Sequence, residues 1–137
     1  MRSNLSVLGL VLAVAFCGCQ QNEGISQKAK VQRLKTASEL KSKMDAGSIT
    51  VVHALDAEHY AKGHIPGAQN IDYEKMTPDM LPEQKDQPIV FYCSGGMCPV
   101  GRMAASKAAK WGYTDVWEYH GGIKDWKRAG MPVEKGP

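Results

Sequence analysis

The chain has 137 residues, of which 43% are hydrophobic, and carries a formal net charge of +3. This length suffices for one domain with a hydrophobic core and is too short for two ordinary domains. The positive excess is small, and no aromatic interleaving or nucleic-acid-binding motif accompanies the lysines and arginines, which argues against a nucleic-acid-binding protein.

The first 18 residues resemble a bacterial lipoprotein signal peptide. Arg2 gives a positive start, and residues 5–16 form an almost uninterrupted apolar run. The run has the length of a signal-peptide h-region and is shorter than the roughly 20 residues of a membrane-spanning helix. Small Gly18 precedes Cys19, so the resemblance implies cleavage there and a lipid on Cys19. The chain would then be exported and held on the periplasmic face of the envelope, with the outer membrane among its destinations. An ordinary secretory signal or an uncleaved anchor is the alternative.

The next segment, residues 19–30, is polar and lacks an apolar period, which predicts a flexible tether before a domain over residues 31–137. Apolar spacing, β-branched runs and glycine stops predict the first elements of that domain. They are a strand over 31–35, a helix capped by Thr36 or Ser38 that ends at Ala46, a strand over 49–54 and a short helix over 57–62.

The second half of the domain continues the alternation. The predicted elements are a strand over 68–71, a loop over 73–81 with one helical turn, a strand over 89–92, a helix over 99–111, a strand over 115–119 and a last helix over 123–129. Alternating strands and helices predict an α/β domain with a mostly parallel sheet. Right-handed crossovers place the loops that follow the strands at one edge, where such sheets bind ligands.

Cys93 is expected at that edge. It directly follows the apolar strand 89–92 and opens the glycine-rich segment 93–99, which leads into a helix. Loop N–H groups and a helix N-terminus both favour negative charge, so we expect the pKa of Cys93 to lie below its ordinary value of about 8.5. Because the thiolate is the nucleophile, the pattern predicts a cysteine-based group-transfer site. A buried, inert core cysteine is the alternative.

Cys98 is the second thiol of this segment. If residues 1–18 are removed and Cys19 is acylated, Cys93 and Cys98 are the remaining thiols. Cys98 can resolve a persulfide or sulfenate on Cys93, form a structural disulfide with it, or be a loop residue without a role, and the sequence leaves these alternatives open. The cysteine spacing and the absence of a second pair argue against a zinc site, so no metal is expected.

Three segments in order resemble the rhodanese-like (sulfurtransferase) family. Residues 60–68 are close to its Gly-His-Ile-Pro-Gly-Ala signature, Tyr92-Cys93 and the loop resemble its active site, and residues 121–133 contain its Gly-Gly-Ile-x-x-Trp and Gly-x-Pro-Val elements. The resemblance implies a small three-layer α/β domain with helices on both sides of a central sheet. It also implies transfer of a sulfane sulfur from a small donor such as thiosulfate to cyanide or a thiol, without a cofactor.

Carried over residue by residue, the resemblance makes Cys93 the persulfide-forming residue. The loop N–H groups would hold the outer sulfur and the anionic oxygens of the donor, which is the arrangement that stabilises other bound anions. The residues expected to bind substrate are Ser94, Gly95, Gly96, Met97 and Arg102.

The chain departs from the family at positions that are usually charged. His53-Ala54-Leu55 stands where the family has Asp-x-Arg, and Cys98 stands where the loop usually ends in arginine. The nearest arginine, Arg102, comes nine residues after Cys93. Lower positive charge in the loop argues against thiosulfate as the natural donor. A thiol–disulfide redox protein that uses both cysteines, and a non-catalytic binding or sensing module, therefore stay open beside the sulfurtransferase.

Overall fold

The computed structural model describes residues 29–137. The predicted signal peptide, the lipidation site Cys19 and all but the last two residues of the predicted tether lie outside the described residues. Within the described part, no helix has the length and apolar character needed to cross a membrane.

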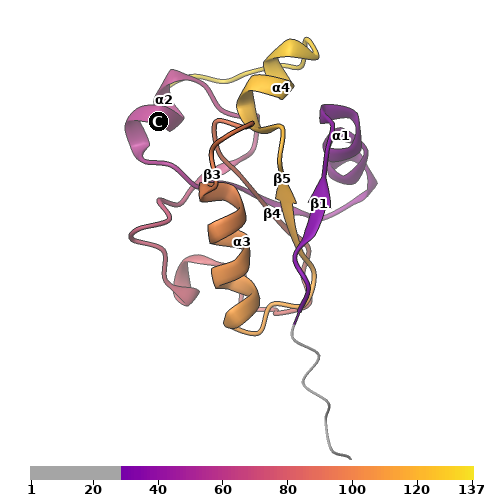
Figure 1. Ribbon diagram of the computed structural model, residues 1–137, viewed down its shortest axis with the longest axis vertical. Coiled ribbons are helices and arrows are strands. Elements are labelled where there is room, and N and C mark those ends of the chain that lie inside the picture. Colours follow the sequence, from indigo (N-terminus) through magenta and orange to yellow (C-terminus); the bar gives the residue numbers. More distant parts are fainter. Residues whose placement is uncertain (1–28) are drawn as a thin grey trace, which may run out of the picture.

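Five strands form one sheet in the order β1-β5-β4-β2-β3, and every pairing between them is parallel (Figure 1). The strands are β1 (Gln32–Leu34), β2 (Thr50–His53), β3 (Gln69–Asn70), β4 (Ile89–Tyr92) and β5 (Val116–Tyr119). The helices are α1 (Ala37–Ala46), α2 (Ala57–Lys62), α3 (Val100–Lys110) and α4 (Gly122–Arg128), with a short 3₁₀ turn η1 (Pro78–Met80). The predicted α/β class with a mostly parallel sheet is confirmed.

The central strand β4 is buried on both sides and divides the core into two layers. Ile89 and Phe91 pack with the small alanines of α3 on one side. Val90 and Tyr92 pack on the other side, with residues of α1 and with Trp126 of α4. Successive side chains of a strand point to opposite faces, so the four residues of β4 contribute two side chains to each layer of the core. Figure 1 shows α3 (orange) lying alongside the strands, with α1 and α4 away from it.

Sequence and structure agree on the helices and strands, and the predicted and observed ends of each element differ by at most one residue. Thr36, rather than Ser38, caps α1, because its side chain accepts from the N–H of Glu39 while the Glu39 carboxylate accepts from the N–H of Thr36. The helical turn expected between 73 and 81 is η1. The last helix begins one residue earlier than predicted, at Gly122.

The loop that follows β4 interlocks with the glycine turn before α4. The N–H of Ile123 donates to the carbonyl of Cys93 at 3.0 Å, and the N–H of Gly96 donates to the carbonyl of His120 at 3.3 Å. Gly122 has a φ of +59°, and a Cβ placed on it would lie 2.4 Å from the nitrogen of Gly95 and 2.5 Å from the oxygen of Cys93. The two backbones therefore touch at a place where no side chain fits.

His53, at the end of β2, is a buried histidine with an unpaired nitrogen. It is 1% exposed, and within residues 29–137 its Nδ1 has no hydrogen-bond partner. The rings of Tyr92 and Tyr60 meet it edge-on, with centroids 5.0 and 5.6 Å away. Burial lowers the pKa of His53 to about 4, so the ring is neutral at physiological pH. An uncharged aromatic cluster thus occupies the place of the carboxylate that the family pattern has.

We expect Gly122→Ala to destabilise the domain far more than Gly96→Ala. Both glycines have left-handed backbones, with φ of +59° and +64°, which costs an alanine about 1 kcal/mol. A Cβ on Gly96 meets nothing within 4 Å, whereas a Cβ on Gly122 overlaps the Cys93 loop and should cost roughly 1–3 kcal/mol more. Urea unfolding of both variants measures the difference, and equal losses would contradict the contact.

We also expect acid to destabilise the fold through His53. Its pKa is about 4 in the folded chain against an ordinary 6.5, so between these values the unfolded chain binds the additional proton. Stability present above pH 6.5 is therefore lost as the pH falls toward 4, by about 3 kcal/mol from this residue. Urea unfolding between pH 7.5 and 4.5 should give a flatter pH slope for His53→Gln than for the wild type. An unchanged slope in His53→Gln would refute the assignment.

Candidate functional site

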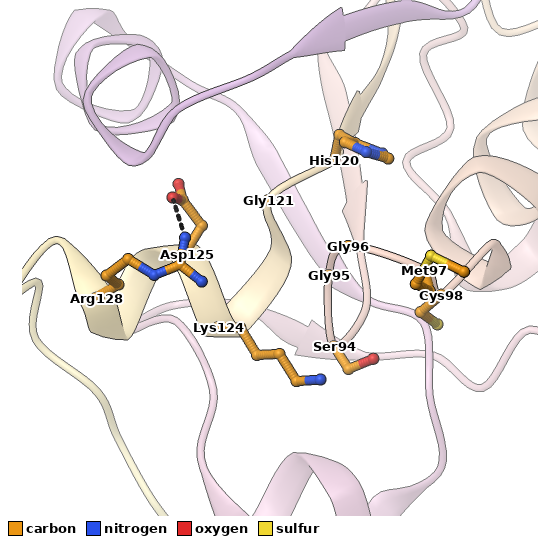
Figure 2. A pocket seen from close by; sticks show the side chains of 10 residues that line it. All are labelled: Ser94, Gly95, Gly96, Met97, Cys98, His120, Gly121, Lys124, Asp125 and Arg128. Carbon is orange, nitrogen blue, oxygen red and sulfur yellow. Dashed lines mark ion pairs between the residues drawn. The ribbon is translucent and has the colours of Figure 1, made fainter.

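A pocket of about 520 Å³ opens between the loop after β4 and the start of α4. It lies at the carboxyl end of the strands, where the sequence places Cys93. Figure 2 shows the loop on one side and the helix residues on the other. The lining residues are Ser94, Gly95, Gly96, Met97, Cys98, His120, Gly121, Lys124, Asp125 and Arg128.

Cys93 is buried and is not one of the lining residues of this pocket, although the loop that directly follows it is. The side chain is only 3% exposed, and its thiol donates to the carbonyl of Cys98 at 3.3 Å. Burial raises the pKa of the Cys93 thiol to about 11, and its hydrogen bond to Cys98 acts in the same direction. The N–H groups of Gly95 and Gly101 oppose this rise without cancelling it.

Cys98 is the thiol that faces the pocket. Cys98 is half-buried whereas Cys93 is buried, and both thiols are free. The Cys93 thiol donates to the backbone carbonyl of Cys98, which joins the two residues. Burial opposes ionisation of Cys98, but hydrogen bonds from the Cys93 thiol, the N–H of Val100 and Ser94 outweigh it and lower the pKa of Cys98. The N–H of Val100 belongs to the first turn of α3, so a helix N-terminus contributes to this stabilisation.

The expectation of a lowered pKa at Cys93 is therefore corrected. Of the loop N–H groups expected to stabilise an anion, those of Gly96 and Cys98 donate to backbone carbonyls instead. The N–H groups of Val100 and Ser94 favour the Cys98 thiolate. Cys93 lies deeper, at the end of a strand that is buried throughout, where loss of water disfavours its charge. When the pH rises, Cys98 therefore loses its proton first and becomes a thiolate while Cys93 is still protonated.

The charged residues of the pocket come from α4 and its approach. Asp125 accepts from the N–H of Ala37 at 3.0 Å and from the hydroxyl of Tyr119 at 2.7 Å, and its other oxygen lies 4.0 Å from Arg128. Lys124 forms no ion pair within residues 29–137. In Figure 2 its side chain extends toward Ser94, while that of Arg128 is directed at Asp125.

The residues expected to bind substrate divide into two groups. Ser94, Gly95 and Gly96 line the pocket, and Met97 stands on its rim with 99% of its surface exposed. Arg102 does not line it. Arg102 is exposed on α3 and borders a separate hollow with Tyr73 and residues further along that helix.

Sequence reasoning missed the pocket residues on α4, Lys124 and Arg128. A signal for them exists: they are four residues apart, hence on one helix face, directly after the Gly121-Gly122 turn. As for metals, the described residues hold no cluster of three or more His, Cys, Asp or Glu side chains that suits an ion.

We expect iodoacetamide to modify Cys98 at a lower pH than Cys93. Only the thiolate reacts, so the rate at Cys98 should reach half its maximum below its ordinary pKa of 9, and Cys93 should require a pH well above 9. Peptide mass spectrometry over a pH series distinguishes the sites. Cys93→Ala removes a hydrogen bond to the Cys98 thiolate and should move the Cys98 midpoint upward. A Cys93 midpoint below that of Cys98 would contradict this order.

Comparison with known proteins identifies the family. The family described as Rhodanese-like domain matches residues 36–129. A thiosulfate sulfurtransferase GlpE of Pseudoalteromonas translucida is 31% identical over 86 residues, which are 63% of this chain and 80% of that protein. An HTH-type transcriptional regulator of Mycobacterium tuberculosis is 35% identical over 101 residues, 74% of this chain, and this chain covers 44% of the regulator's length.

The crystal structure of the BH2092 protein from Bacillus halodurans has the same fold, with a TM-score of 0.66 and 31% identity over 76% of this chain and 77% of that one. The family match includes β2, the loop after β4, the glycine turn and α4. It thus extends over well more than half of the chain and over every element that forms the pocket. The protein therefore belongs to the rhodanese-like domain family.

Proposed function

We propose that this protein is a sulfurtransferase that carries a sulfane sulfur as a persulfide on Cys93 and passes it to cyanide or a thiol. The observation that carries the proposal is the pair of free thiols, Cys93 and Cys98, joined by the hydrogen bond from the Cys93 thiol to the Cys98 carbonyl, beside a pocket that the basic side chains of Lys124 and Arg128 line. The similarity to GlpE proteins described as thiosulfate sulfurtransferases supports it.

The proposed reaction has two steps. In the first, the Cys93 thiolate attacks the outer sulfur of a donor such as thiosulfate, the sulfur–sulfur bond of the donor breaks, and sulfite leaves with the bonding electron pair. In the second, cyanide attacks the terminal sulfur of the persulfide, thiocyanate leaves, and the Cys93 thiolate is regenerated. Each step consumes one anionic nucleophile and releases one anion, and no external oxidant or reductant is required.

Within this proposal Cys98 acts as the base for Cys93. Cys93 is protonated at neutral pH, and its neighbour Cys98 carries the first negative charge. The Cys93 thiol donates to the Cys98 carbonyl at rest, and rotation of this S–H toward the Cys98 thiolate would transfer the proton and produce the buried thiolate without help from water. A buried thiolate is less hydrated than an exposed one, and hydrogen bonds from the N–H groups of Gly95 and Gly101 stabilise its negative charge.

A second candidate function is thiol–disulfide exchange, favoured by the contact between the two thiols and the lowered pKa of Cys98. The Cys98 thiolate would attack a substrate disulfide and release one substrate thiol. Cys93 would then attack the mixed disulfide, lose its proton and release the second thiol. The protein pair becomes a disulfide as the substrate becomes two thiols.

The location of the protein is part of the proposal. We propose that residues 1–18 direct export and that a lipid on Cys19 holds the domain at the bacterial envelope, on the resemblance of that segment to lipoprotein signals. The domain would then act in an oxidising compartment, where the Cys93–Cys98 pair requires a reductant to stay free.

The test is intact-mass spectrometry of the reduced chain after brief incubation with thiosulfate. We expect a gain of one sulfur atom that cyanide removes. Cys93→Ser should abolish the gain. Cys98→Ser should slow its formation because the base is lost, and should lengthen its life because no thiol remains to displace hydrosulfide and form the Cys93–Cys98 disulfide.

The outcomes separate the candidates. A chain that gains no sulfur but becomes two hydrogens lighter with a disulfide substrate is a redox protein. A chain that does neither is a binding module. A sulfur that still attaches when Cys93 is serine would move the persulfide to Cys98 and refute the assignment of the two thiols.

A further inference from the structure

We propose that Lys124 selects an anionic sulfur donor at this pocket and takes the place of the arginine that the loop lacks. This inference rests on the proposed sulfur transfer and names the residue that determines its donor class. The sequence puts Cys98 at the position of the usual loop arginine, and Arg102 borders a different hollow. The positive charge of the pocket therefore has to come from another element, and α4 supplies it.

Lys124 differs from the other basic residues of the pocket because no carboxylate engages it within residues 29–137. Arg128 is near Asp125, whose carboxylate is fixed by Tyr119 and the N–H of Ala37. The Nδ1 of His120 lies 3.3 Å from the buried carboxylate of Glu118. A cation that already has a carboxylate attracts a second anion less strongly, so Lys124 is the basic side chain open to a substrate.

Backbone hydrogen bonds hold Lys124 against the loop that follows β4. Its own N–H donates to the carbonyl of Ser94 at 3.2 Å, and the N–H of Ile123, one residue earlier, donates to the carbonyl of Cys93. The side chain, which lines the pocket, extends toward Ser94 in Figure 2. The backbone of Lys124 is thus held against the loop that carries both thiols, and its exposed side chain lines the pocket that this loop borders.

The charges of the reaction explain why a cation is needed there. A thiolate that attacks thiosulfate brings one negative charge toward two, and Coulomb repulsion opposes the encounter. A lysine ammonium is a compact charge without a preferred approach direction, which suits a small tetrahedral oxyanion group better than a planar carboxylate. The geometry places the oxyanion end of the donor at Lys124 and its sulfane sulfur at the thiols. The donor class is therefore a small oxyanion such as a thiosulfonate or thiosulfate, rather than an uncharged organic trisulfide.

The experiment compares alkylation by iodoacetate, which is anionic, with alkylation by iodoacetamide, which is neutral. The rate ratio at Cys98, located by peptide mass, reports the local potential of the pocket without any sulfur donor. In Lys124→Gln we expect the ratio, measured for both reagents at one pH so that the thiolate fraction cancels, to fall about threefold. The KM for thiosulfate should rise about fivefold with little change in kcat. Lys124→Arg should restore both, and salt at about 0.5 M should bring the wild-type ratio down to that of Lys124→Gln.

The matched control is Lys127→Gln, which removes the same charge from the same helix. Lys127 is not a lining residue of the pocket, and its ammonium lies beside Gly63. An unchanged ratio in Lys124→Gln, or an equal fall in Lys127→Gln, would overturn the role of Lys124. A wild type that accepts no sulfur while the ratio falls only in Lys124→Gln would refute the sulfur transfer and leave anion selection by Lys124 standing.

Discussion

The site depends on the backbone contact between the loop after β4 and the glycine turn before α4. Two glycines from segments far apart in the chain, Gly95 and Gly122, approach so closely that neither has room for a Cβ. The hydrogen bond from Ile123 to the carbonyl of Cys93 then joins the start of the helix to the loop that carries both thiols. Because α4 is held in this way, its charged side chains line the same pocket as the loop. Loop conformation, pocket shape and electrostatics therefore follow from one contact.

Burial makes the two thiols differ in acidity and in access to solvent. The strand that delivers Cys93 is buried on both faces, so its thiol is deep and resists ionisation. Cys98 lies five residues further on, where the loop meets the first turn of α3 and the pocket is open, and there the N–H groups favour its thiolate. One thiol of the pair is therefore accessible and the more acidic, and the other is protected from solvent, which is the arrangement that the proposed sulfur transfer uses.

At the position of His53 this chain differs from the family pattern in the residue that it buries. Where the family pattern has a carboxylate, this chain has a neutral imidazole between Tyr60 and Tyr92. Tyr92 in turn accepts the N–H of Ile65 at 3.0 Å, in the segment that carries the family signature. Aromatic packing and one hydrogen bond thus connect β2, β4 and the signature segment without a buried charge, which avoids the cost of desolvating a carboxylate. The consequence is a fold with a buried titratable group that is neutral at physiological pH.

The sequence by itself determined the order of strands and helices, the parallel sheet and the edge at which Cys93 lies, because hydrophobic period, caps and glycine stops act over neighbouring residues. It also determined the family, through segments that keep their order and spacing. The tertiary structure alone decided which thiol is acidic, because the pKa values of Cys93 and Cys98 depend on burial and on N–H groups from two elements. It likewise decided that Lys124 rather than Arg102 faces the pocket, since that depends on which helix packs against the loop. Local patterns encode the elements, whereas long-range packing sets desolvation and electrostatic fields, which no spacing of residues along the chain records.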